Sequence, residues 1–402
     1  MARNTNSKPT KEIILDAAFS FLSEPRFSSF SMNELAEKVG ISKPAIYRHF
    51  KNKEDLLAGM EQRILDNMSF FLKDIDYKDN AGVRKSVANL VDFFVANPNY
   101  INYLIAQMSS TPNYESHLLS KSYDHSDIKS LTRHVFCGMT IFYFVKLQEQ
   151  FLKLKKIESL SENFGEKIVN LLFSGLTGST QTNDAFHPDI IPQSRRLELF
   201  NLCKISDETF PEENRIFTAL ANVIEKYKIP GVTVERIAAE LNMAKSSLYE
   251  YFDNKNEMVK CLINKELQLL QTIIIENSAE AANFTEYVHI LIASEMEYFS
   301  HRQSIIPICG WLLMGGEPAS EKEMENCEKE GEAAPWEKRL PKKVCSPDLG
   351  FQYTPDVITG WIRCLPIAFL VEAKGKNISK EKCMEGFMLM IDFILNGIDG
   401  GK

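Results

Sequence analysis

The chain has 402 residues, of which 44% are hydrophobic and 25% charged, and its formal net charge is −8 at pH 7. This length predicts two or more domains, and the composition is ordinary for a soluble globular protein. The sequence contains no apolar run of about 18 residues, so no membrane span is predicted. The N-terminus has no apolar segment typical of a signal peptide. We therefore expect a cytoplasmic protein. The acidic net charge does not exclude a nucleic-acid binder, because such binding depends on a local basic face.

The first predicted helix covers residues 12–22, EIILDAAFSFL, whose apolar side chains fall on one helical stripe. Ser31 then stands as an N-cap with Glu34 three residues later, which is the pattern of a capping box. This pattern predicts a short helix over residues 32–39. Gly40 ends that helix, at a position where the turn requires a left-handed backbone conformation that favours glycine.

A third helix is predicted over residues 43–50, KPAIYRHF, with Ser42 as its cap and Pro44 in its first turn. Two short helices joined by a tight turn that contains glycine predict a helix-turn-helix. Residues 53–75 are then predicted to form a long fourth helix that leaves this unit.

The same pattern occurs a second time. Shifting the sequence by 202 positions aligns residues 12–60 with residues 214–262 without a gap. Identical aligned pairs include Ala36 and Ala238, Lys43 and Lys245, Tyr47 and Tyr249, Phe50 and Phe252, and Lys53 and Lys255. One helical domain is therefore predicted twice, and the second copy leads into another long helix over residues 255–277.

Weaker repeat traces follow each copy in the same order. MTIFYFVK (139–146) resembles LPIAFLVE (365–372), and LFSGLTG (172–178) resembles ILNGIDG (394–400). Between the halves, residues 179–207 begin with a polar, turn-rich stretch and are predicted to be a linker. Residues 316–352 are interpreted as an exposed charged insertion.

The stretch SMNELAEKVGISKPAIYRHFKNKEDL resembles the DNA-binding domain of the TetR family of transcriptional regulators. The resemblance is strong over residues 11–60 and good over residues 213–262. The family implies an all-α subunit, in which three N-terminal helices bind DNA and about six more form a ligand-binding and dimerising domain. This chain would then consist of tandem TetR-like helical repeats.

The resemblance implies five parts: a first helix-turn-helix domain (1–52), a first helical ligand-binding and dimerisation domain (53–178), a linker (179–207), a second helix-turn-helix domain (208–254) and a second helical domain (255–402). The family normally works as a homodimer. We therefore expect the two halves to pair within one chain as a pseudo-dimer. The helices before Gly178 and Gly400 would form its four-helix interface.

A recognition helix places its first turns against base edges in the major groove, and residues at helix N-termini can meet phosphate. The DNA-contacting residues expected in the first copy are Ser31, Lys43, Pro44, Ala45, Tyr47, Arg48, His49 and Lys53. Those expected in the second copy are Thr233, Lys245, Ser246, Ser247, Tyr249, Tyr251 and Lys255. The N-terminal arm, with Arg3, Lys8 and Lys11, can add phosphate contacts.

The second copy departs from the pattern at several positions. Asn242 replaces the turn glycine, and Ala244 replaces the serine cap. Glu250 and Asp253 replace two basic residues of the first copy, at the helix that would face phosphate. We therefore expect the second copy to bind DNA more weakly or to prefer a different half-site, which implies an asymmetric operator.

Bulky side chains at helical spacing are candidates for an effector pocket, although such stripes are more often core. The candidates are Phe94, Tyr103, Phe136, Met139, Trp311 and Trp361. No GxSxG, HExxH or phosphate-loop pattern occurs, so we do not expect an enzyme. The predicted function is a ligand-responsive repressor. The alternative is a sensor or scaffold that does not bind DNA, in which the helix-turn-helix units serve protein contacts.

The eight cysteines are scattered and form no CxxC pair, which predicts free thiols in a reducing compartment. A zinc site built from Cys327, Cys345 and a histidine is an alternative without a supporting ligand spacing. We therefore expect no metal and no cofactor.

Overall fold

The computed structural model describes residues 10–21, 30–71, 80–103, 127–153, 164–177, 188–206, 210, 214–227, 232–249, 255–306 and 355–400. All regular elements within these ranges are helices, and none is a strand. The chain is built of tandem all-α units, as the helical spacing of its apolar residues predicted. Within these ranges, no helix has both the length and the apolar character that crossing a membrane requires.

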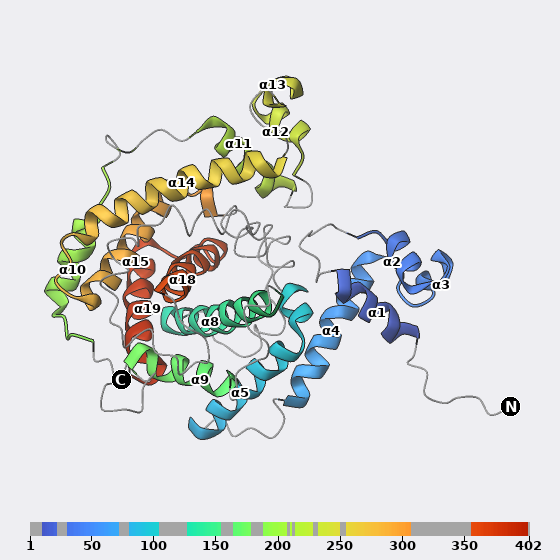
Figure 1. Cartoon of the computed structure of the whole chain (residues 1–402), viewed down its shortest axis with the longest axis horizontal. Helices are drawn as coiled ribbons and strands as arrows, with labels where there is room; N and C mark the ends of the chain where they lie inside the picture. Colours follow the sequence, from blue (N-terminus) through green and yellow to red (C-terminus); the bar gives the residue numbers. More distant parts are fainter. Residues whose placement is uncertain are drawn as a thin grey trace.

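The first half consists of α1 (Thr10–Phe21), α2 (Met32–Val39), α3 (Lys43–Tyr47), α4 (Lys53–Phe71), α5 (Asn80–Ala96), α8 (Ile128–Lys153), α9 (Phe164–Ser174) and the 3-10 turn η1 (Gly175–Thr177). The second half consists of α11 (Arg215–Tyr227), α12 (Val234–Glu240), α13 (Lys245–Tyr249), α14 (Lys255–Ser278), α15 (Phe284–His301), α18 (Pro355–Gly375) and α19 (Lys380–Gly400). In both halves, three short helices precede one long helix. Figure 1 shows these short helices, α1–α3 and α11–α13, as two separate units at the periphery of the molecule.

The two halves meet along α8 and α9 of the first half and α18 and α19 of the second. Trp361 on α18 is fully buried there, and its Nε1 donates a hydrogen bond to Thr140 Oγ1 at 3.0 Å. Its ring centroid lies 6.0 Å from that of Phe136 on α8. The hydroxyl of Tyr143 donates to the carbonyl of Val357 at 3.0 Å. We call this contact of four helices the seam; it joins residues more than 200 positions apart.

Two glycines touch at one end of the seam. Gly175 (φ 58°) and Gly397 (φ 72°) occupy the same place in the repeated stretches LFSGLTG and ILNGIDG, and both have left-handed backbone conformations. A Cβ on Gly175 would lie 2.4 Å from the amide nitrogen of Gly397, and one on Gly397 would lie 2.3 Å from the carbonyl carbon of Phe173. Neither position can hold a larger residue without moving backbone.

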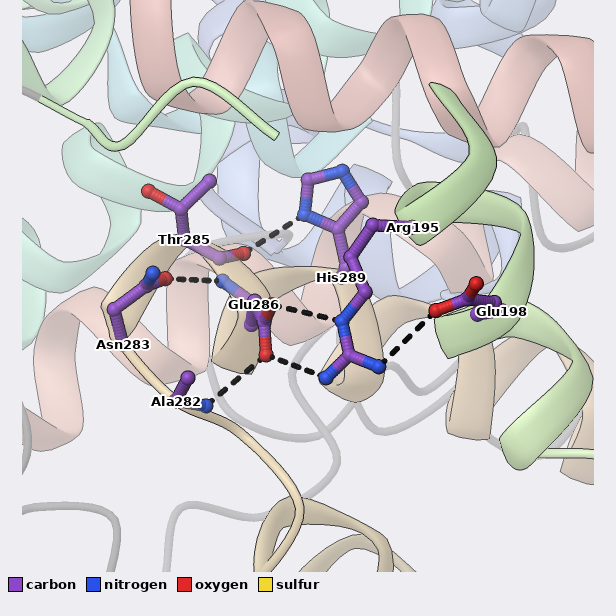
Figure 2. A network of polar contacts seen from close by, with 7 residues as sticks. All are labelled: Arg195, Glu198, Ala282, Asn283, Thr285, Glu286 and His289. Carbon is purple, nitrogen blue, oxygen red and sulfur yellow. Dashed lines mark hydrogen bonds and ion pairs between the residues drawn. The ribbon is translucent and has the colours of Figure 1, made fainter. Parts of the chain in front are cut away.

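Part of the predicted linker is a helix, α10 (Gln193–Leu202), that packs on α15. Figure 2 shows Arg195 of α10 paired with Glu286 of α15 through two contacts, Nε to Oε1 at 2.9 Å and Nη2 to Oε2 at 3.0 Å. Leu199 and Phe200 of α10 are buried. The linker prediction did not anticipate this docking, because it rested on the turn-rich residues that precede α10. The charged insertion predicted over residues 316–352 lies outside the described residues.

Cys137, Cys203 and Cys383 are free thiols. Cys327 and Cys345, the two cysteines of the zinc alternative, lie outside the described residues.

Candidate nucleic-acid interface

The first helix-turn-helix begins with the capping box that the sequence predicted. Ser31 Oγ accepts a hydrogen bond from the Glu34 amide at 3.2 Å, and the Ser31 amide donates to Glu34 Oε2 at 2.6 Å. These hydrogen bonds from Ser31, its backbone amide first, lower the pKa of the Glu34 carboxyl. The start of α2 is therefore stabilised locally, before any contact with the rest of the fold.

The same backbone hydrogen bond closes the turn in both copies. Gly40 adopts φ 75°, and the Ile41 amide donates to the Ala36 carbonyl at 3.0 Å. In the second copy Asn242 adopts φ 54°, and the Met243 amide donates to the Ala238 carbonyl at 2.9 Å. Asparagine tolerates this left-handed conformation, so the turn keeps its geometry without glycine.

The recognition helix α3 and the three residues that follow it present one polar face and one buried face. Ile46 and Phe50 are buried in the core, whereas Tyr47 is 40% exposed. The other predicted contact residues that are exposed are Lys43, Pro44, Arg48 and His49, and Ala45 is half-buried. Ser42 takes the N-cap position, but its side chain makes no hydrogen bond to the first turn of α3. Its carbonyl instead accepts from the Ala45 amide at 2.8 Å.

Lys53, at the start of α4, has a structural role beside its expected phosphate contact. Its ammonium donates to the Phe30 carbonyl at 2.8 Å and lies 5.0 Å from the centroid of the Phe30 ring. Burial lowers the pKa of Lys53. The side chain thus ties α4 to the residues that lead into α2. In the N-terminal arm, Lys11 lies on α1 with its ammonium 5.5 Å from the Phe50 ring, and Arg3 and Lys8 lie outside the described residues.

The second helix-turn-helix keeps one half of the capping arrangement. Thr233 Oγ1 accepts from the Arg236 amide at 3.3 Å. Arg236 stands where the first copy has Glu34, so it supplies no carboxylate for the reciprocal hydrogen bond. Its guanidinium carbon instead lies 4.2 Å from the ring centroid of Tyr227 on α11.

At the start of the second recognition helix, the Lys245 ammonium forms an ion pair with Glu235. The hydrogen bond from Lys245 lowers the pKa of Glu235 to about 2. Ser246 is exposed, Ser247 is half-buried and Leu248 is buried. Our sequence reasoning missed Glu235, although the 202-residue shift places it opposite Asn33 and so marks a change from a neutral to an acidic side chain.

The remaining second-copy candidates are only partly described. Tyr249 ends α13 and Lys255 begins α14, but their side chains lie outside the described part of the structure. Tyr251, Glu250 and Asp253 also lie outside it.

The effector candidates that the structure describes sit in packed surroundings. Phe136 and Trp361 lie in the seam, and Tyr103 is 1% exposed, with its hydroxyl donating to the Leu57 carbonyl of α4 at 2.8 Å. Phe94 is buried and Met139 is half-buried. Trp311 lies outside the described residues.

Two exposed recognition helices, each held against a capped partner helix by a left-handed turn, define a DNA-binding protein of the helix-turn-helix class. Residues 14–60 and residues 216–262 each match the family model for bacterial regulatory proteins of the tetR family. The chain therefore carries two DNA-binding domains of the tetR type in tandem, and this supports a DNA-binding transcription regulator.

Proposed function

We propose that the chain is a ligand-responsive repressor that binds an asymmetric operator as a single-chain pseudo-dimer. The observation that carries this proposal is the seam. A protein that must present two recognition helices to one duplex normally obtains the second from a partner subunit. Here α8 and α9 pack against α18 and α19 of the same chain, so the surfaces that a homodimer would use are already covered.

The difference between the two recognition helices supports an asymmetric operator. A homodimer presents two identical helices and favours a palindrome, but a fused chain is free of that constraint. The first helix offers Lys43, Pro44 and Arg48, whereas the second offers Ser246 and Ser247, whose hydroxyls can bond to several base edges. We expect half-sites about one helical turn apart, with roughly 34–36 Å between the two recognition helices.

An effector would act through the helices that hold the DNA-binding units. In the first half, Tyr103 donates to the Leu57 carbonyl of α4, and Asn67 of α4 donates to the Tyr100 hydroxyl at 3.0 Å. A small molecule that competes for these hydroxyls would loosen the packing of α4. Because α4 follows α3 directly in the chain, this change would reach the recognition helix. We place the effector site in the helical domains, with Phe94, Tyr103 and Met139 as first-half candidates.

The test combines stoichiometry with footprinting. Light scattering should give one chain in solution and one chain per duplex. Sequences selected from a random duplex library should contain two unlike half-sites, and hydroxyl-radical footprinting should protect the first more strongly. A dimer of chains on the duplex would overturn the pseudo-dimer. A perfect palindrome protected equally on both sides would overturn the asymmetric operator. Absence of salt-dependent duplex binding would favour the scaffold alternative.

A further inference from the structure

A charged contact in the second DNA-binding domain distinguishes it from the first. Lys245 is the first residue of α13, and its ammonium meets the carboxylate of Glu235 near the start of α12. In the first domain the aligned residues are Lys43 and Asn33, so the lysine is retained and the carboxylate is absent from that position. The pair therefore changes the electrostatics of one recognition helix and not the other.

The contact lies where a helix-turn-helix meets DNA. The first turn of the recognition helix faces base edges, and the N-terminus of the preceding helix approaches the phosphate backbone. Glu235 is the second residue of α12, directly after Val234 and its cap Thr233. A carboxylate there competes for the Lys245 ammonium and also repels phosphate.

We propose that Glu235 is a specificity-determining residue that holds Lys245 in an intramolecular ion pair and thereby weakens the second half-site. This inference rests on the proposed DNA-binding function and deepens it. The domain can read its half-site only after the pair opens. The two half-sites then differ in affinity because of one carboxylate as well as the bases that they contain.

The pair is expected to adjust affinity rather than to abolish binding. The two side chains keep 47% and 57% of their surface exposed. Exposed ion pairs of this kind favour the closed form by only about two- to fivefold. Removing the carboxylate also removes a repulsion from phosphate, so we expect a total gain of about three- to tenfold at low salt.

The test exchanges the aligned residues in the full-length chain, on a duplex selected by the wild-type protein. Glu235→Asn installs the first-domain residue, and Asn33→Glu makes the reciprocal change. Glu240→Gln is the control: it removes another carboxylate of α12, which accepts a hydrogen bond from Asn222. Fluorescence anisotropy over a salt series gives affinity and slope, and footprinting assigns each change to a half-site.

Glu235→Asn should raise affinity three- to tenfold, steepen the salt slope by about one unit and strengthen protection of the second half-site. Asn33→Glu should weaken the first half-site, and Glu240→Gln should change affinity less than twofold. In a Lys245→Ala background, Glu235→Asn should raise affinity less, because only the part of the gain due to lost phosphate repulsion remains.

Three outcomes overturn the inference while the proposed function stands. The wild type could protect both half-sites with Glu235→Asn changing nothing, Glu240→Gln could give an equal gain, or the full gain could persist after Lys245→Ala. By contrast, a wild-type chain that binds no duplex contradicts the proposed function itself.

Discussion

Tyr47 is the last residue of α3 and Lys53 is the first residue of α4, and their side chains differ in exposure and in contacts. Tyr47 projects from α3 with 40% of its surface exposed. Lys53 is half-buried, and one of its three donors is used on the Phe30 carbonyl. This contact gives Lys53 a role in the fold of the domain, and we propose that its remaining donors also make the expected phosphate contact.

We therefore expect the two alanine substitutions to separate binding from stability. Tyr47→Ala should weaken DNA binding and leave the unfolding free energy within about 0.5 kcal/mol of the wild type, because the side chain is exposed. Lys53→Ala should weaken binding, reduce the salt slope by about one unit and lower the unfolding free energy by about 1 kcal/mol. Anisotropy titrations and denaturant melts measure these changes. Equal stability of the two variants would contradict the tie between Lys53 and Phe30.

At the scale of elements, α10 joins two helices of the second half through one arginine. Arg196 Nε donates to His289 Nε2 of α15 at 3.0 Å, and its Nη2 donates to the Met388 carbonyl of α19 at 2.9 Å. Nη2 also lies 3.0 Å from Asp392 Oδ1. Figure 2 shows His289 Nδ1 beside the Thr285 carbonyl, at 2.8 Å, so the neutral ring donates from Nδ1 and accepts at Nε2 from Arg196. Protonation would place an N–H against the guanidinium.

This arrangement predicts an acid-sensitive docking of α10. Burial lowers the pKa of His289 from 6.5 to about 4. Between these two pH values, His289 is protonated in the unfolded chain but stays neutral in the folded chain. The contribution of neutral His289 to stability is therefore complete above pH 6.5 and is lost as pH falls toward 4. The loss should reach about 2 kcal/mol by pH 5, since each pKa unit is worth about 1.4 kcal/mol.

Urea melts followed by tryptophan fluorescence measure this effect, because all three tryptophans lie in the second half. The wild type should lose more stability than His289→Gln between pH 7.5 and pH 5. The difference between the two proteins isolates His289 from other groups, including Glu286, whose pKa is lowered mainly by its hydrogen bond with Arg195. Parallel pH curves for the two proteins would refute the assignment.

At the scale of the whole molecule, the seam is the contact that joins the two halves. Its aromatic contacts bury Trp361, and its glycine pair lets the backbones of η1 and α19 approach closely. The ion pair between Arg84 of α5 and Asp399 of α19, at 3.2 Å, adds a contact at the same end. Because both side chains are about one third exposed, this ion pair contributes little beside the packing.

Substitution of the seam glycine should therefore be far more harmful than substitution of an ordinary helical glycine. Gly397→Ala should lower the unfolding free energy by about 2 kcal/mol or more, because it adds left-handed strain and a clash with the Phe173 backbone. Gly138→Ala, on α8, is the matched control. A Cβ there meets no described heavy atom within 4 Å beyond its own helix, so a gain of about 0.5–1 kcal/mol is expected. Denaturant melts compare the two, and similar effects would contradict the close approach.

The sequence by itself determined the features that depend on neighbouring residues. The capping box of Ser31 and Glu34, the left-handed turn at Gly40 and the apolar stripes of the helices involve groups a few positions apart, so local spacing is enough to predict them. The 202-residue repeat extended these predictions to the second copy, including the turn at Asn242. The helix-turn-helix and its duplication were therefore predictable.

Only the tertiary structure decided the contacts that join one helix to another. The pairing of Gly175 with Gly397, the docking of Arg196 against His289 and the ion pair of Glu235 with Lys245 depend on how helices are placed. No local spacing carries that information, because the same apolar stripe or surface charge can pack in many arrangements. The packing of η1 on α19 brings the two glycines together, the packing of α10 on α15 brings Arg196 to His289, and the packing of α13 on α12 places Lys245 beside Glu235.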